Sequence, residues 1–313
     1  MLKYYKLEAD HIVLAEDEDS SDIIMMSVPT SEQRSVLLKE YEIPEHTITS
    51  AFDNDELSRI EYDDDFMAIV FKKPKNYSAE DNFQFSVESF GIFIFEDWIL
   101  LLTSSEFPLL DRRRFSKINS LNTLVLKLLN YSIFHFNEHL NIINRINNEL
   151  EEKLKSAMEN KHLLSMFSLN KGLIYYTSAL NSNGILLTKL QLGRSLKFTE
   201  TERELLDDIL IENKQSQQQA EIYVNVLASM MDARASVINN NVNSLMKTLN
   251  VVTIALMGPT FIASVFGMNV TFPFTLGESN PSSFWIIIII SVLAMLISVV
   301  SVIIFMFFWE SRR

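Results

Sequence analysis

Two nearly uncharged apolar stretches occupy the C-terminal end of this 313-residue chain. The first, from Thr248 to Val270, contains no charged residue, and the second, from Phe284 to Trp309, has serines as its only polar side chains. Because a helix rises about 1.5 Å per residue, roughly 20 residues cross a hydrocarbon core about 30 Å thick. The second stretch also lacks the polar face that would mark it as a buried core helix. We therefore predict two transmembrane helices.

The middle of the chain has the apolar spacing of long helices. Leu121–Asn160 and His162–Leu192 both repeat apolar residues at helical intervals. A capping box at 199–202 begins a third helix, and neither glycine nor proline follows before Gly258. If this helix continues into the first span it reaches Phe266 or beyond, on the order of 100 Å. A helix that long cannot be buried in one small domain, so we expect it to form a bundle with its copies.

Two features of the helical region leave alternatives open. The asparagines at 239–241 are a place where the third helix could break. Glu212–Gln219 is polar on all faces, which predicts a solvent-lined or loosely packed stretch. His135 and His139 have the i, i+4 spacing of metal ligands, but two histidines do not complete a zinc site, and we interpret them as part of an ordinary polar helix face.

The first 120 residues have a mixed α/β pattern. Aromatic and β-branched runs at 66–71, 90–95 and 98–103 predict strands, the last two forming a hairpin. Ser31–Tyr41 predicts a helix. The predicted fold class is therefore an α+β domain (1–120), long antiparallel helices (121–198), a stalk helix (199–247) and two C-terminal transmembrane helices (248–270 and 284–309), joined by a loop (271–283) and followed by a short basic end (310–313).

Charge is divided unevenly along this plan. The chain has 27 Lys+Arg and 40 Asp+Glu, a net charge of −13, and all of that excess lies on residues 1–247. Such an acidic chain argues against nucleic acid as a partner, since phosphate binding requires clustered Lys and Arg. Cysteine is absent, which excludes disulfides and thiolate metal sites. The phosphate-loop, dinucleotide and nucleophile-elbow motifs of enzymes are also missing, so we do not predict an enzyme.

The flanking charges predict the orientation in the membrane. Lys247 precedes the first span and Arg312 and Arg313 follow the second, whereas 271–283 contains no Lys or Arg. By the positive-inside rule both termini are cytoplasmic, and the N-terminus has no apolar segment typical of a signal peptide. We expect a multi-pass protein of the cell membrane with a short external loop.

Two helices cannot enclose a water-filled path, so a conduit requires several copies around an axis. The first span is the better candidate to line it, because the second is apolar enough to face lipid. It carries polar side chains at Asn250, Thr253, Thr260, Ser264 and Asn269. Pro259 cannot donate to the carbonyl of Ala255, so a kink or a carbonyl turned toward a lumen is expected there.

Gly267, Met268 and Asn269, at the outer end of the first span, resemble the Gly-Met-Asn signature of the CorA family of divalent-cation channels. The resemblance extends through 243–249 and 257–263, which are similar to the family's pore helix, and the order of parts matches over nearly the whole chain. It implies a homopentamer in the lipid bilayer that carries Mg²⁺, and also Co²⁺ or Ni²⁺, along a pore lined by the first span.

The resemblance also implies roles for individual residues. Gly267, Met268 and Asn269 would form the outer selectivity site, and Asn243 would surround the cytosolic mouth. The remaining pore-lining and gating positions would be Leu249, Met257, Thr260 and Ser264. Asp208 would bind a regulatory Mg²⁺ between subunits, with a partner carboxylate that the sequence does not identify. Glu278 is the single acid available to attract cations at the external loop.

The chain departs from the family pattern at several positions. Phe266 stands where tyrosine is usual, Ser264 where glycine is common, and Pro259 lies one position late.

Neutral amide oxygens such as that of Asn269 suit an ion that keeps its hydration shell, as Mg²⁺ does. Two other functions remain open: a zinc transporter of the related ZntB group, which shares the motif, and a membrane-anchored sensor that conducts nothing.

Overall fold

The computed structural model describes residues 2–8, 10–76, 84–154, 160–193, 196–268 and 281–310. The chain divides into an N-terminal unit, Met1–Met231, and a C-terminal unit, Asp232–Arg313. One helix, α5 (Glu200–Phe266), belongs to both units, because it continues across their boundary without a break.

A seven-stranded mixed sheet forms the centre of the N-terminal unit. Its strands stand in the order β2-β1-β3-β7-β6-β5-β4, with β3 and β7 parallel and all other neighbours antiparallel. The strands are β1 (Leu2–Glu8), β2 (His11–Leu14), β3 (Ile23–Ser27), β4 (Arg59–Tyr62), β5 (Met67–Pro74), β6 (Val87–Ile94) and β7 (Ile99–Thr103). The hairpin predicted from 90–95 and 98–103 is confirmed by β6 and β7, which pair Ile94 with Ile99.

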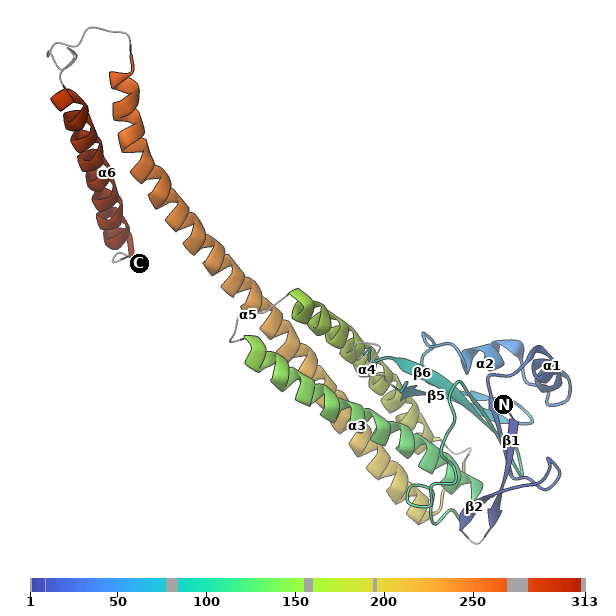
Figure 1. The fold of residues 1–313 in the computed structure, drawn as a ribbon. Helices are drawn as coiled ribbons and strands as arrows, with labels where there is room; N and C mark the ends of the chain where they lie inside the picture. Colours follow the sequence, from blue (N-terminus) through green and yellow to red (C-terminus); the bar gives the residue numbers. More distant parts are fainter. Residues whose placement is uncertain are drawn as a thin grey trace. The chain divides into compact units, whose positions relative to one another are not determined.

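Alternating side chains of the central strands fill two separate cores. On β7, Ile99 and Leu101 belong to the core on one face, and Leu100 and Leu102 to the core on the other. The first face is covered by α3 (Leu121–Leu154) and α4 (Asn160–Leu192), and the second by α1 (Ser31–Lys39) and α2 (Glu45–Ser50) (Figure 1). Because both faces are buried, these strands are continuous apolar runs in the sequence.

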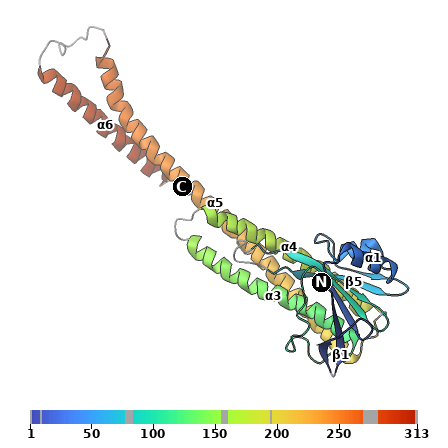
Figure 2. The same cartoon turned by 45° about the vertical axis from the view of Figure 1, so that its right-hand side comes forward.

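Helices α3, α4 and the first part of α5 lie side by side and enclose a third core (Figures 1 and 2). Its fully buried side chains include Phe136, Met166, Tyr176 and Leu227. The predicted capping box is confirmed: Thr199 N donates to Glu202 Oε2 at 2.8 Å, and Glu202 N donates to Thr199 Oγ1 at 3.3 Å. Glu202 also accepts from Ser120 and Thr123 at the start of α3, so one carboxylate joins the starts of two helices.

The prediction that 212–219 is solvent-lined or loosely packed holds for one side of the helix only: Glu212, Lys214, Gln215 and Gln218 are exposed, whereas Asn213 and Ser216 are buried. Asn213 and Ser216 are 2% and 0% exposed, because this part of α5 packs between α3 and α4. Each side chain makes a hydrogen bond to one of those helices: Asn213 Nδ2 donates to Leu180 O at 2.9 Å, and Ser216 Oγ donates to Asn137 Oδ1 at 2.5 Å, while Asn213 Oδ1 has no partner among the described residues. Small polar residues are tolerated there because each makes a hydrogen bond.

His135 and His139 are also misread as an ordinary polar helix face. His139 is 3% exposed, and its Nδ1 shares a 2.5 Å hydrogen bond with Tyr176 Oη. His135 lies against it, with 4.5 Å between ring centroids. Among the described residues, no three His, Cys, Asp or Glu side chains come together as a metal site. The pair is a partly buried element of the helical core.

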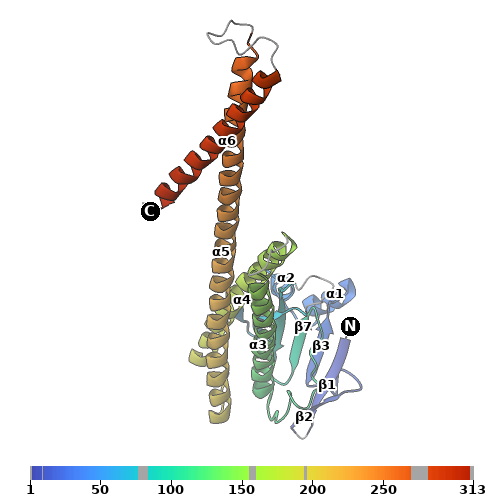
Figure 3. The same cartoon turned by 60° about the vertical axis from the view of Figure 1, so that its left-hand side comes forward.

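In the C-terminal unit, α5 continues to Phe266, and α6 spans Pro281–Glu310 (Figure 3). The helix is unbroken at 239–241 and passes through Pro259, so the alternative of a break is wrong. α6 begins at Pro281, so residues 281–283 are helical although the sequence predicts them as the end of the loop. The two helices meet where Gly258 lies against Ala294 and Ser298: a side chain at Gly258 would come within 3.2 Å of Ser298 Oγ.

The buried histidines predict that acid destabilises the N-terminal unit. Burial, followed by the charges of Lys73 and Arg114, lowers the pKa of His135 from 6.5 to about 4. Burial, followed by the charge of His135, lowers the pKa of His139 to about 3. Between pH 6.5 and about 4 the unfolded chain therefore binds more protons than the folded chain, and stability falls as the pH falls.

The measurement is the apparent thermal midpoint of the detergent-solubilised chain at a series of pH values, followed by circular dichroism. The double variant His135→Gln, His139→Gln should lose much less of its midpoint between pH 7 and about 5 than the parent chain does. His46→Gln, which removes an exposed histidine, should keep the parent's pH dependence. An unchanged slope in the double variant would contradict the assignment.

Candidate functional site

The residues with predicted roles in conduction lie along the C-terminal part of α5, and those with described side chains are exposed. Leu249 and Met257 are 58% and 64% exposed, and Met268 is 56% exposed. Asn243, Thr260, Ser264 and Gly267 are exposed as well. Such exposure of leucine and methionine leaves apolar surface that the chain itself does not cover.

These residues share one side of the helix. At 3.6 residues per turn, successive side chains are separated by about 100°, which puts all of them within an arc of about 120°. We call this arc the polar face, because it contains Asn243 and four polar side chains of the span, Asn250, Thr253, Thr260 and Ser264, whereas Thr248 at the start of the span lies on the other side. Asn250 and Thr253, which were noted only as polar residues of the span, therefore join the candidate site.

The opposite side of α5 faces α6. Ala255 is 6% exposed and Gly258 is in close contact with α6, while Val251 and Ile262 are half-buried. On the same helical count these four residues lie roughly opposite the polar face. The small residues allow the two backbones to approach closely, as is typical of helix pairs in membranes. Contact with α6 thus leaves the polar face free.

The two threonine hydroxyl groups of the polar face donate hydrogen bonds within the helix. Thr253 Oγ1 donates to Leu249 O at 2.8 Å, and Thr260 Oγ1 donates to Leu256 O at 2.7 Å. Each hydroxyl oxygen still has lone pairs that point away from the helix. Such neutral oxygens can accept hydrogen bonds from water, including the water bound to a hydrated cation.

Two backbone features distinguish the span, one at Pro259 in its middle and one at the end of the helix. Pro259 has no N–H, so the carbonyl of Ala255 lacks its usual helical partner. At the end of the helix, Gly267 N donates to Ala263 O at 2.9 Å and Met268 N to Val265 O at 3.2 Å. No described glycine has a positive φ angle, so Gly267 is not required as a left-handed helix cap.

The remaining predicted residues are apart from the polar face or outside the described structure. Asn269 and Glu278 lie outside the described residues. Asp208, in the N-terminal unit, is exposed, whereas its neighbour Asp207 accepts a hydrogen bond from Gln191 at 2.5 Å. Within the described residues Asp208 has neither an ion pair nor a side-chain hydrogen bond, and no cluster of three metal ligands includes it. A metal ion there would need ligands from elsewhere.

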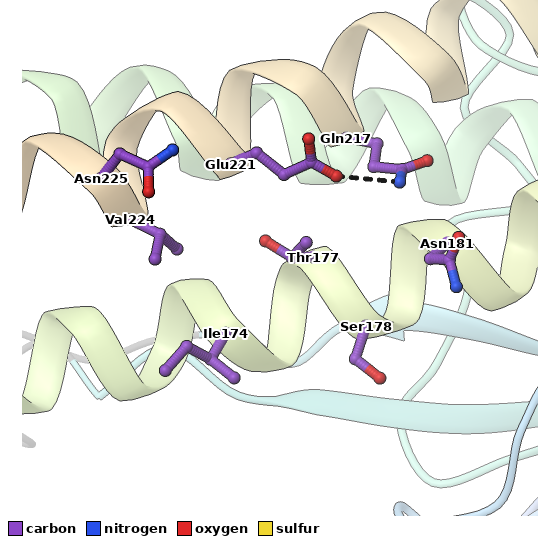
Figure 4. Close-up of a pocket in the computed structure, with 8 residues that line it drawn as sticks. All are labelled: Ile174, Thr177, Ser178, Asn181, Gln217, Glu221, Val224 and Asn225. Atoms are coloured by element: carbon purple, nitrogen blue, oxygen red, sulfur yellow. Dashed lines mark hydrogen bonds between the residues drawn. The ribbon is translucent and has the colours of Figure 1, made fainter.

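A groove of about 530 Å³ runs between α4 and α5 in the N-terminal unit (Figure 4). Ile174 and Val224 line it together with amide and hydroxyl groups, and its single carboxylate, Glu221, accepts a hydrogen bond from Gln217 at 3.0 Å. One carboxylate and scattered amides do not converge on a point, so the groove lacks the ligand set of a divalent-cation site.

Helix α5 is the one helix among the described residues that is long and apolar enough to cross a membrane. Only 6% of the most apolar 18-residue segment of α5 is buried, whereas the core helix of a soluble protein would be mostly buried. In α6 the described apolar run is shorter, Ile288–Ile304. The surface of both helices therefore matches a lipid or partner-covered environment better than water.

Comparison with known proteins identifies relatives with the same architecture. The cobalt/magnesium transport protein CorA of Methanocaldococcus jannaschii is 27% identical over 280 residues, which are 87% of this chain and 86% of that protein. The complete structure of the CorA magnesium transporter from the same organism has a TM-score of 0.79 at 23% identity and covers 95% of each chain. The cytoplasmic domain of ZntB from Vibrio parahaemolyticus has a TM-score of 0.60 at 12% identity, over 76% of this chain and 98% of that domain.

At such low identities the structural likenesses establish the fold. The family is shown independently, because the sequence model described as CorA-like Mg²⁺ transporter protein matches residues 18–308. This is a family of membrane ion transporters and not of enzymes. With the long helix, the mixed sheet and the matched sequence in agreement, the chain belongs to the CorA family.

Proposed function

We propose that this protein is a channel that carries Mg²⁺, and also Co²⁺ or Ni²⁺, into the cell across its membrane. The observation that carries the proposal is the polar face of α5, which lies opposite the contact with α6. Polar side chains on a membrane helix are costly when they face lipid, so they turn toward other protein or toward water. The CorA relative from Methanocaldococcus jannaschii is a cobalt/magnesium transport protein, which agrees with this use of the face.

The proposed arrangement in the membrane has 248–270 and 284–309 as spans and both termini in the cytoplasm. Lys247 and the C-terminal arginines support this orientation by the positive-inside rule. The loop between the spans would then be external, and Glu278 would be its single acid. The acidic N-terminal unit would lie in the cytosol.

Assembly follows from the geometry of one chain. A pair of helices has no lumen, and the polar face needs neighbours that are also polar. We propose a homopentamer in which five copies of α5 surround an axis with their polar faces inward, while α6 faces lipid. In this ring the exposed apolar positions of α5, such as Leu249 and Met257, would be covered by their copies instead of by water.

The proposed path combines polar and apolar rings. Gly267, Met268 and Asn269 would form the outer selectivity site, Thr260 and Ser264 would offer hydroxyl oxygens below it, and Asn243 would surround the cytosolic mouth. Mg²⁺ loses its water reluctantly, so neutral oxygens that bind the hydrated ion select it without dehydrating it. The apolar rings formed by Leu249 and Met257 would close the path when water leaves the narrow section that they line, because ions cannot cross a dry segment.

The ZntB group provides the second candidate function. Its cytoplasmic domain has the same fold as the N-terminal unit, so the fold alone does not separate Mg²⁺ from Zn²⁺. The ligand chemistry favours Mg²⁺, because zinc prefers thiolate and imidazole. The chain has no cysteine, and the possible ligand groups of the polar face are amides, hydroxyls and the thioethers of Met257 and Met268, without a thiolate or an imidazole.

We also propose a regulatory Mg²⁺ bound between copies at Asp208. The side chain is exposed and has no partner within the described residues, so it is available to an ion held jointly with another copy. The −13 charge of each chain makes close approach of copies unfavourable unless cations intervene. Bound Mg²⁺ would hold the ring closed, and its loss would shift the population toward the open state.

The transport proposal is tested by uptake into proteoliposomes, with Mg²⁺ and Zn²⁺ measured in parallel. The parent chain should take up Mg²⁺ faster than Zn²⁺, and Asn269→Ala should reduce Mg²⁺ uptake to background because the outer amide is lost. Asn240→Ala, the same substitution on an exposed position of α5 away from the polar face, should transport normally. Normal Mg²⁺ uptake by Asn269→Ala would refute the selectivity site. If the parent chain takes up Zn²⁺ faster than Mg²⁺, the ZntB-like function is favoured. If the parent chain takes up neither ion, a sensor is favoured.

The regulatory proposal is tested by current through excised patches while cytosolic Mg²⁺ is titrated. Asp208→Ala should raise the half-inhibiting Mg²⁺ concentration about tenfold, as expected when an ion loses one charged ligand. Asp207→Ala, which removes the neighbouring carboxylate that is hydrogen-bonded to Gln191, serves as the matched control and should change it little. Native mass spectrometry of both variants should give five copies; a smaller assembly for the parent chain or an unshifted titration for Asp208→Ala would contradict this account.

A further inference from the structure

We propose that the N-terminal unit binds a nucleoside di- or triphosphate in a pocket at the start of α3. The pocket has a volume of about 260 Å³ and lies in the unit that does not contain the polar face of α5. Two arginines precede α3, and the other lining residues stand on α3 itself. The lining residues are Arg113, Arg114, Lys127, Asn130, Tyr131 and Phe134.

The backbone holds this pocket in place. Asp111 begins a tight turn in which its carboxylate accepts from Arg113 N at 3.0 Å and its carbonyl accepts from Phe115 N at 2.8 Å. Phe115 is 1% exposed and fixes the turn to the core under the sheet. On α3, Lys127, Tyr131 and Phe134 are spaced by four and three residues, so they share one helix face. The basic and aromatic groups therefore converge without any rearrangement of the chain.

The charges of the pocket are only partly neutralised. Arg114 has the two nearby acids: it lies 3.7 Å from Asp111 and 3.3 Å from Glu138. Arg113 and Lys127 have no ion pair or side-chain hydrogen bond within the described residues. Two cationic side chains thus face a small pocket without counter-ions, on a chain with a net charge of −13. A site that is positive on such an acidic chain fits an anion better than a metal ion.

The aromatic side chains narrow the class of anion. The guanidinium of Arg114 lies over the rings of Tyr131 and Phe134, at 5.2 and 4.7 Å from their centroids. Phe134 nevertheless remains 44% exposed, so part of its ring is available to a planar group. Guanidinium and ammonium groups bind phosphate oxygens, and bases stack on aromatic rings. We infer that Arg113 and Lys127 hold the phosphates and that Phe134 contacts the base.

The pocket's size sets a limit on the ligand. About 260 Å³ accommodates a diphosphate with part of a nucleoside, but it does not provide a continuous track for a nucleic-acid strand. The acidic charge of the rest of the chain also opposes a polyanion. The pocket therefore matches the phosphates of a free nucleotide, and the rest of the nucleoside would lie outside it against the exposed part of Phe134.

The test is isothermal titration calorimetry of the full chain in detergent with ADP, in buffer that contains EDTA so that no divalent cation can bridge the nucleotide to a carboxylate. ADP should bind once per chain, and Arg113→Gln and Lys127→Gln should each weaken binding about tenfold, as expected for a lost charge-assisted hydrogen bond. Arg112→Gln removes the same charge from an exposed residue that does not line the pocket, and it should change the affinity less than about twofold.

Pyrophosphate separates a nucleotide site from a plain phosphate site. It should bind more weakly than ADP, and Phe134→Ala should weaken ADP binding about fivefold while leaving pyrophosphate binding unchanged. Circular dichroism confirms that each variant is folded. The proposal is overturned if about 1 mM ADP gives no binding heat, if Arg112→Gln has the effect of Arg113→Gln, or if pyrophosphate binds as tightly as ADP and Phe134→Ala has no effect.

Discussion

The C-terminal unit exposes apolar surface that its two helices cannot bury against each other. The proposed membrane location and assembly both follow from this constraint. Residues as large as Leu249, Met257 and Phe261 are more than half exposed on α5, and Trp285 and Ile297 are equally exposed on α6. Water is an unfavourable environment for such surface, at roughly 25 cal/mol per Å². Lipid can cover α6, but it cannot satisfy the polar face of α5. A bilayer together with further copies of the chain meets both requirements.

The N-terminal unit buries its apolar side chains in three hydrophobic cores. Two lie on opposite faces of the sheet, and the third lies among α3, α4 and α5. Glu202 joins two of these helices at their starts, since its carboxylate accepts hydrogen bonds from Thr199 at the start of α5 and from Ser120 and Thr123 at the start of α3. The first turn of the helix that bears the candidate site is therefore fixed through the buried carboxylate of Glu202, and the helix continues into the C-terminal unit without a break.

Local patterns in the sequence were sufficient for most elements but not for long-range packing. The capping box and the β6–β7 hairpin were predictable, because each depends on residues close in the chain, whereas the continuity of α5 through 239–241 was open from the sequence alone. The burial of Asn213 was not predictable, since its partner Leu180 belongs to another helix and its own segment contains no apolar stripe. The pocket at Arg113 was missed for the same reason, although the run of arginines at 112–114 was a visible signal. The roles of Asn269 and Asp208 remain predictions drawn from family resemblance.

The central claim is that the polar face of α5 lines a water-filled path, and the absence of cysteine makes it directly measurable. Single cysteines placed one at a time from 249 to 268 can be reacted with a membrane-impermeant thiol reagent in the assembled protein in lipid. We predict fast labelling at Leu249, Thr253, Met257, Thr260 and Ser264, slowed by Mg²⁺, and little labelling at Val251, Ala255 and Ile262. Labelling that is equal on all sides of the helix, or fastest on the side that faces α6, would contradict the account.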